Sequence, residues 1–233
     1  MARTKWELGD AIRCANELAD LADEHWSGLA PRCAPDAVSR LRSEIASLVA
    51  AQVEATNKRI DKRAATLRQN EALARGHEVV SLVRNVVRVS FRSNKALQRR
   101  FGFGTRPKSS GSTKAALELL LSAMEEESDK ARAAGLLSED VAMVRDALSM
   151  VLEAESARVA TRASASAAIA ERNRAQRRVE RAVSELYAVA RLAFRLEPES
   201  CAQFDRAMPL SRGARDSASR KAARLAAQAL PAA

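Results

Sequence analysis

The chain has 233 residues, a formal net charge of +10 and 47% hydrophobic residues, but only 3% aromatic residues. With so few aromatic residues, eight glycines and six prolines, it does not resemble a sheet protein, because strands favour β-branched and aromatic residues and need frequent turns. No uncharged apolar run is long enough to cross a bilayer, so we expect no membrane partner.

The first 26 residues predict a helix bracketed by Trp6 and Trp26. We interpret the two tryptophans as packing anchors, with interface residues as the alternative. Acidic residues occupy the positions where a secretion signal needs apolar ones, so we predict a cytoplasmic protein; they are Glu7, Asp10, Glu17 and Asp20. Three widely spaced cysteines without a CxxC pattern predict reduced, mostly buried thiols; they are Cys14, Cys33 and Cys201.

The sequence repeats itself at a fixed offset. A shift of 103 positions aligns residues 38–70 with 141–173, and the match continues without a gap to Phe101 and Phe204. The identical pairs include Val38/Val141, Arg42/Arg145, Arg59/Arg162, Asn70/Asn173, Arg75/Arg178, Ser81/Ser184, Val86/Val189, Arg88/Arg191, Phe91/Phe194 and Arg92/Arg195. Such self-similarity predicts a tandem duplication.

Both copies carry apolar residues at helical spacing. "VVSLVRNVVRVSF" alone could form a strand, but its counterpart "AVSELYAVARLAF" favours a helix, and two copies of one unit should share a fold. Each unit is predicted as a shorter leading helix followed by about sixty residues of helical pattern. One long helix or an antiparallel hairpin would satisfy this pattern; we favour the hairpin, turning near Asn70 and Gly76 in one copy and near Asn173 in the other. The predicted fold class is all-α: a tandem-duplicated helical bundle built from long antiparallel helices, in two similar three-helix units.

The predicted boundaries follow the repeat. Residues 1–104 form the first helical unit, 105–112 a linker, 113–207 the second helical unit and 208–233 a tail. The tail is basic and rich in alanine and lacks a bulky apolar face, so we predict it to be disordered.

The segment "RRFGFGTRPKSSGSTK", residues 99–114, uses the residue types of phosphate-binding loops. A Walker A loop has GxxxxGK[ST] after a strand, whereas here Lys114 follows the hydroxyl residues and no strand precedes them. We therefore predict a linker, pinned by Phe101 and Phe103, with Ser112 or Thr113 as the N-cap of the next helix. No small-molecule ligand is implied.

Catalytic and metal-binding patterns are absent from the sequence. A dinuclear metal site in a helical bundle needs Glu-x-x-His, but Ala22 and Ala74 stand three residues before His25 and His77. Zinc-binding spacing is absent as well. We predict no catalytic residues, no metal and no cofactor, and we expect that the protein is not an enzyme.

Basic residues concentrate in the same part of each copy. Fourteen basic and three acidic residues lie between Lys58 and Lys108, and nine basic and three acidic residues between Arg158 and Arg195. Like charges one helical turn apart repel, so such stripes need solvation or an anionic partner. The candidate stripe on the third helix of the first unit is Arg84, Arg88, Arg92, Lys95 and Arg99. Its counterpart in the second unit is Arg174, Arg177, Arg178 and Arg181.

An acidic segment separates the two basic ones. Ten acidic and three basic residues lie between Glu118 and Glu155. Its centre is a candidate acidic interface, formed by Glu125, Glu126, Glu127, Asp129, Glu139 and Asp140. Acidic and basic surfaces on one chain suit packing between helices or between subunits. A solvated, partly self-neutralised face is the simplest alternative.

The sequence therefore predicts a non-enzymatic structural or scaffold protein that acts through protein–protein contacts, with itself or another protein as partner. Homo-oligomers would form by head-to-tail pairing of acidic and basic surfaces. The alternative is a nucleic-acid-binding protein that uses the arginine-rich helix faces, although these lack aromatic residues for base stacking. A helical enzyme whose site is not visible in the sequence is the third hypothesis.

Overall fold

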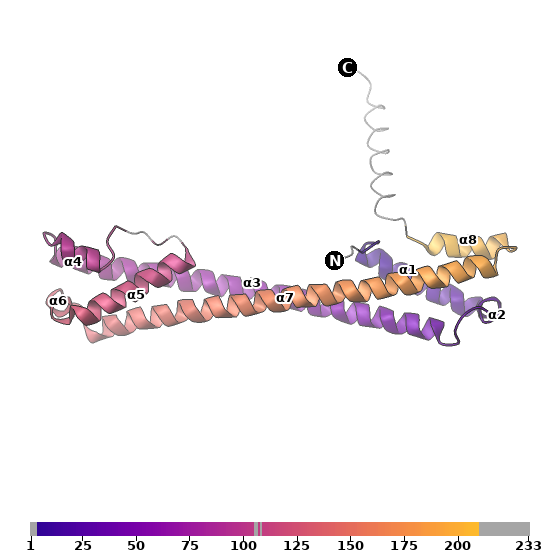
Figure 1. The fold of residues 1–233 in the computed structure, drawn as a ribbon, viewed down its shortest axis with the longest axis horizontal. Helices are drawn as coiled ribbons and strands as arrows, with labels where there is room; N and C mark the ends of the chain where they lie inside the picture. The colour runs from indigo at the N-terminus through magenta and orange to yellow at the C-terminus, as the bar shows by residue number, and fades with distance from the viewer. Residues whose placement is uncertain (1–3, 105–106, 108, 210–233) are drawn as a thin grey trace, which may run out of the picture. The chain divides into compact units, whose positions relative to one another are not determined.

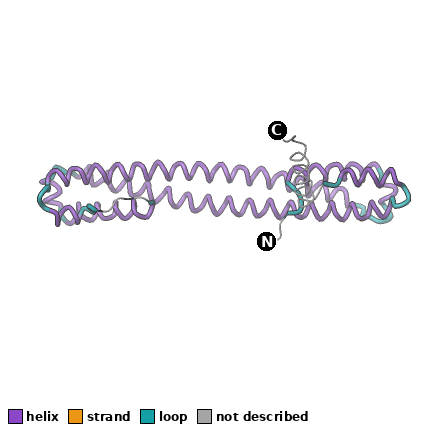
Figure 2. Tube along the Cα trace, turned by 90° about the horizontal axis from the view of Figure 1, so that it is seen from above, coloured by secondary structure: helices purple, strands orange, loops and turns teal. Residues whose placement is uncertain are grey.

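The computed structural model describes residues 4–104, 107 and 109–209, and these contain eight helices and no strand (Figures 1 and 2). The predicted all-α class is confirmed. The helices in chain order are α1 (Leu8–Glu24), α2 (Trp26–Leu29), α3 (Ala37–Ser90), α4 (Lys95–Arg100), α5 (Ser110–Glu126), α6 (Ser128–Ala133), α7 (Ser138–Ala193) and α8 (Pro198–Ala207). None of them is both long enough and apolar enough to span a bilayer. The predicted tail lies outside the described residues from position 210 onward.

Helices α3 and α7 have 54 and 56 residues, and each is continuous. The predicted hairpin in each long segment is therefore wrong. Asn70 and Gly76 lie inside α3 and Asn173 lies inside α7. Both helices bury apolar side chains before and after these positions. Packing of these buried faces outweighs the low helix propensity of asparagine and glycine, and no proline interrupts either helix.

Gly76 serves close packing rather than a turn. A Cβ atom at this position would lie 3.0 Å from Cγ2 of Thr113 and 3.3 Å from Cδ1 of Leu117, both on α5. The missing side chain therefore lets α5 approach α3 closely.

The chain forms two compact units, each assembled from segments far apart in sequence. Unit 1 contains the residues up to Thr56 and those from Ala167 onward, and unit 2 contains Asn57–Ser166. Within each unit the α3 and α7 segments run antiparallel and pack together (Figure 1). The predicted repeat units 1–104 and 113–207 each contribute to both compact units, and their boundaries stay a prediction.

The core of unit 1 lies between α1, the start of α3, the end of α7 and α8. Its buried side chains include Cys14, Leu18, Leu41, Leu48, Val179, Val183 and Phe204. Phe194 and Phe204 stack with their ring centroids 5.7 Å apart, and His25 meets Phe194 edge-on at 5.4 Å. Trp6 is buried, which agrees with its predicted role as a packing anchor, and Trp26 packs partly buried against the same core.

The core of unit 2 lies between α5, the start of α7 and the end of α3. Its members include Val79, Val83, Val87, Leu117, Leu120, Val144 and Val151. Phe101 is completely buried and Phe103 packs against this core, so the predicted anchoring of the linker is confirmed. Helix α5 begins at Ser110 with Ser109 as its N-cap, and Ser109 and Ser112 form a capping box. The N-cap predicted at Ser112 or Thr113 is therefore wrong, because the Ser109 hydroxyl already accepts the hydrogen bond of the first turn.

Candidate functional site and interaction surfaces

The predicted basic stripe of the first repeat unit lies in compact unit 2, and its five residues do not lie on one helix. Helix α3 ends at Ser90, so only Arg84 and Arg88 belong to it. Arg92 lies in the following turn, and Lys95 and Arg99 lie on α4. The i,i+4 spacing of the basic residues continues past Ser90, but the helix does not. Asn94 caps a new helix, α4, because its side chain accepts a hydrogen bond of 3.0 Å from the backbone N–H of Leu97.

Arg84 is buried rather than exposed to a partner. Only 9% of its surface is accessible, and its Nε donates a hydrogen bond of 3.2 Å to the carbonyl of Phe101. Burial lowers the pKa of its guanidinium group. Gly102 has φ of +74°, and a Cβ atom there would lie 2.6 Å from Nη2 of Arg84. The loop after α4 therefore closes tightly over this arginine.

The remaining members of the stripe are exposed. The guanidinium of Arg88 lies 5.4 Å from the ring centroid of Phe103, which is a cation–π contact. Lys95 donates a weak hydrogen bond of 3.5 Å to Gln98. Arg92, Lys95 and Arg99 thus form a basic end of unit 2, while Arg84 and Arg88 belong to a pocket under the loop.

The second basic set lies on a single helix, α7, in unit 1. At about 100° per residue, Arg174, Arg177, Arg178 and Arg181 occupy an arc of about 100°. Two of them are neutralised within the chain. Arg174 pairs with Glu171 at 2.6 Å, and Arg178 pairs with Glu44 of α3 at 2.8 Å. Hydrogen bonding to Glu44 raises the pKa of Arg178.

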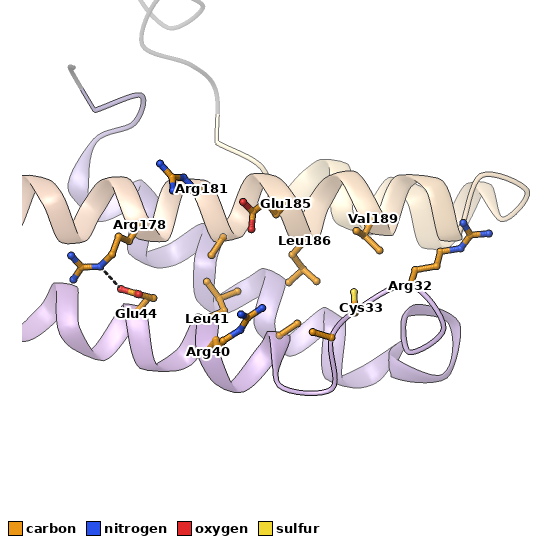
Figure 3. Close-up of a pocket in the computed structure, with 13 residues that line it drawn as sticks. Arg32, Cys33, Arg40, Leu41, Glu44, Arg178, Arg181, Glu185, Leu186 and Val189 are labelled. Carbon is orange, nitrogen blue, oxygen red and sulfur yellow. Dashed lines mark hydrogen bonds and ion pairs between the residues drawn. The ribbon is translucent and has the colours of Figure 1, made fainter. Parts of the chain in front are cut away.

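A groove of about 370 Å³ lies beside this set in unit 1 (Figure 3). Four arginines and two glutamates line it together with small and apolar residues, namely Arg32, Arg40, Arg178, Arg181, Glu44, Glu185, Cys33, Ala34, Ala37, Leu41, Ala182, Leu186 and Val189. Figure 3 shows Leu41 and Leu186 facing each other between α3 and α7, while Arg181 points away from α3. We call this the basic groove; its glutamates offset part of its charge.

The acidic residues predicted as an interface lie in unit 2, on α5, on α6, at Glu127 between these two helices and at the start of α7, and most of them have partners. Glu127 pairs with Arg100 and with Lys130, and the hydrogen bond from Lys130 lowers its pKa. Glu125 pairs with Arg145 at 3.3 Å. Glu126 accepts a hydrogen bond of 2.6 Å from Ser122, and Asp140 accepts one of 2.8 Å from the Leu137 backbone at the start of α7. Asp129 and Glu139 are the members with no such contact within the described residues.

An exposed apolar face on α3 adds a surface that the sequence analysis did not single out. Leu82, Val86 and Val89 are 50%, 37% and 78% exposed. Their i, i+4, i+7 spacing places them on one side of the helix, and the buried Val79, Val83 and Val87 define another side. We call Leu82, Val86 and Val89 the α3 apolar face.

The most buried polar arrangement in unit 1 was also not predicted. Glu180 of α7 is only 3% exposed, and its carboxylate accepts hydrogen bonds from the backbone N–H groups of Lys5 and Trp6 at 2.9 and 3.1 Å. Gln176 donates to the same carboxylate at 3.0 Å and to the carbonyl of Trp6 at 2.9 Å. The two side chains fix the segment that precedes α1. This role is structural and is invisible in a sequence pattern dominated by arginine.

The histidines and cysteines form no catalytic constellation among the described residues. His25 pairs with Gln203 at 2.9 Å and His77 with Thr113 at 2.7 Å, in different units. The three cysteines are free, Cys14 being buried and the other two half-buried. No cluster of three or more His, Cys, Asp or Glu in the described part of the chain could hold a metal ion.

Comparison with protein-family models, with curated proteins and with solved structures finds no match to this chain.

Proposed function

We propose that the protein is a non-enzymatic, cytoplasmic helical scaffold that acts through protein–protein contacts and associates with itself. The α3 apolar face is the observation that carries this proposal. Three large apolar side chains at i, i+4, i+7 are the pattern by which one helix docks on another. Covering them in a complex would remove apolar surface from water, at about 25 cal/mol for each Å² buried.

A second copy of the chain is the partner that the charges favour. The basic groove of unit 1 carries four arginines and two glutamates. At the equivalent position of the repeat, unit 2 has a groove lined by Arg75, Glu139, Ala142, Met143, Asp146, Ala147 and Met150, where acidic groups exceed basic ones. The groove of unit 1 in one chain and the groove of unit 2 in another therefore carry opposite charge, which supports head-to-tail association through these two grooves.

We also propose that the two halves of the chain are a tandem duplication. Helices α1 to α4 have 17, 4, 54 and 6 residues, and α5 to α8 have 17, 6, 56 and 10. Phe101 and Phe204 are both fully buried; Phe101 directly follows α4, and Phe204 lies in the last turn of α8. Leu18 and Leu120 are both buried, and each is the eleventh residue of its helix, α1 and α5. A duplicated chain offers two similar surfaces, which suits repeated association.

The test is the solution mass of nuclease-treated protein by size-exclusion chromatography with light scattering. We expect a mass of two or more times 25.3 kDa, the mass of one chain. Changing Leu82 and Val89 to lysine should shift the protein toward monomer, whereas Leu196→Lys, at a residue 83% exposed outside this face, should not. A monomeric parent protein, or equal effects of both changes, would contradict the proposal.

Nucleic acid binding remains the alternative, and the basic end of unit 2 favours it. Arg92, Lys95 and Arg99 are all exposed. Changing these three to alanine should weaken binding to DNA or RNA and reduce its salt dependence. A control that removes Arg13, Arg40 and Arg145, which already pair with carboxylates, changes the net charge equally. Equal loss in both variants would indicate attraction by net charge alone.

A further inference from the structure

Unit 2 contains a pocket of about 530 Å³ between α3 and the loop that follows α4. Its described lining residues are His77, Val80, Ser81, Arg84, Asn85, Arg88, Phe103, Gly104 and Pro107. Two of them are arginines, and none is an aspartate or a glutamate. The pocket is therefore cationic, unlike the basic groove of unit 1, where glutamates offset part of the charge.

The polar residues of the pocket come from one side of α3. His77, Ser81, Arg84 and Arg88 follow each other at spacings of four, three and four residues, which aligns them along the helix. The hydrogen bond from Arg84 to the Phe101 carbonyl and the close approach of Gly102 fix the buried guanidinium. The cation–π contact with Phe103 orients Arg88. Both arginines are thus held in place before any ligand arrives.

Further donors and apolar walls complete the pocket. The side chains of Ser81 and Asn85 make no hydrogen bond within the described residues, so a hydroxyl and an amide are available to a ligand. His77 uses Nε2 for Thr113 and contributes the rest of its ring. Val80, Phe103 and Pro107 are apolar. The volume falls within the range of about 300–1,000 Å³ found for small-molecule sites.

We infer that this pocket binds a small molecule that carries a phosphate group beside an apolar body. A phosphate matches several donors at once, and arginine holds it through two parallel hydrogen bonds. Ser81 and Asn85 donate to its remaining oxygens, and the apolar walls cover the body of the ligand. This site differs from a Walker loop because side chains of α3 provide the donors. It does not depend on the proposed scaffold function, and it extends the sequence analysis, which implied no small-molecule ligand.

The described residues of unit 1 form no second site of this kind. The groove at the equivalent position of unit 1 is lined by Lys5, Arg177, Glu180, Arg181, Ser184, Glu185 and Ala188, so two glutamates replace the purely cationic lining. Tyr187 stands at the position that corresponds to Arg84. We therefore expect a stoichiometry of one ligand per chain.

Isothermal titration calorimetry of the full chain with phenyl phosphate, inorganic phosphate and benzoate tests whether the pocket binds a phosphate-bearing ligand. Phenyl phosphate should bind at one per chain and most tightly. Inorganic phosphate should bind more weakly because it lacks the apolar body, and benzoate should bind least because a carboxylate engages fewer donors. Arg88→Ala should weaken phenyl phosphate binding about tenfold or more. The exposed Arg99, on α4 of the same unit, provides a matched control, and Arg99→Ala should leave the affinity unchanged. Circular dichroism spectra of both variants should match that of the parent protein, which would show that both are folded.

Several outcomes would overturn the inference. They are the absence of phenyl phosphate binding at millimolar concentration, benzoate binding as tightly as phenyl phosphate, two equivalents bound per chain, and equal weakening by Arg88→Ala and Arg99→Ala. A short single-stranded oligonucleotide that binds the parent protein and loses affinity equally in both variants, with no phenyl phosphate binding, would show a general polyanion surface instead.

Discussion

His77 on α3 donates a hydrogen bond from Nε2 to the hydroxyl of Thr113 on α5, over 2.7 Å. The donor is assigned because the single hydroxyl proton of Thr113 is already given to the carbonyl of Ser109 at 2.9 Å. Thr113 is fully buried and fixed by both bonds. Gly76 lies beside it, so the first turn of α5 is locked against α3 at a position where α3 has no side chain.

The close packing of α5 on α3 at Gly76 predicts opposite effects of a glycine-to-alanine substitution at two helical glycines, Gly76 and Gly111. In Gly76→Ala the added methyl would sit 3.0 Å from the fixed Thr113, so we expect the free energy of unfolding to fall by about 1 kcal/mol, because the strain exceeds the gain in helix propensity. Gly111 on α5 has no atom within 4 Å of its Cβ position. Gly111→Ala should therefore raise the free energy of unfolding, by about 0.5–1 kcal/mol. Urea denaturation followed by circular dichroism measures both, and a stabilising Gly76→Ala would contradict the close packing.

The Glu180 carboxylate should be the most sensitive polar group of unit 1. Glu180→Ala leaves the N–H groups of Lys5 and Trp6 without their buried acceptor, and we expect a loss of about 2–3 kcal/mol. Because Trp6 is 5% exposed, its release should also shift tryptophan emission to longer wavelength. Glu185→Ala on the same helix removes an exposed carboxylate, and its effect should stay within about 0.5 kcal/mol. Equal losses of stability in Glu180→Ala and Glu185→Ala would contradict the proposed role of the Glu180 carboxylate in fixing the segment that precedes α1.

These residues show which features a sequence can predict here. Helical spacing predicted the all-α class, because periodic burial of apolar residues depends only on the local geometry of a helix. Helical spacing could not distinguish one long helix from a hairpin, because a glycine such as Gly76 is equally compatible with a turn and with close contact between two helices. The basic stripe was extended past Ser90 for a similar reason, since i,i+4 spacing continues across the break that Asn94 makes. Burial of Arg84 and the role of Glu180 depend on segments distant in sequence, which a pattern along one helix does not contain.

Cys14 should be the least reactive of the three thiols. Burial raises its pKa from the ordinary value of 9.0 to about 12, so near pH 8 almost no reactive thiolate is present. Cys33 is half-buried, and burial raises its pKa as well. We expect a thiol reagent to modify Cys201 and Cys33 in the folded protein and Cys14 only after unfolding. Peptide mapping of labelled protein gives the order, and early labelling of Cys14 would show that α1 opens readily.

The same shift predicts a pH dependence of stability. The folded state holds the Cys14 proton more tightly than the unfolded state, so this contribution is complete below about pH 9 and is lost as the pH rises toward about 12. Comparing the urea midpoints of the parent protein and Cys14→Ala between pH 8 and 10 isolates the contribution of Cys14 to stability. The difference between the two proteins should narrow as the pH rises, and a constant difference would contradict the assignment.

Asn70 tests the continuity of α3 directly. The side chain is exposed, so a substitution there changes the backbone with little effect on packing. Asn70→Pro removes a helical hydrogen bond and clashes with the preceding turn, which costs about 3 kcal/mol or more inside a continuous helix. Asn70→Ala should instead stabilise slightly, because alanine has the higher helix propensity. In a hairpin that turned near Asn70, proline would be tolerated. Thermal unfolding followed by circular dichroism distinguishes the two, since a large loss for proline together with a gain for alanine is expected only where the helix runs through.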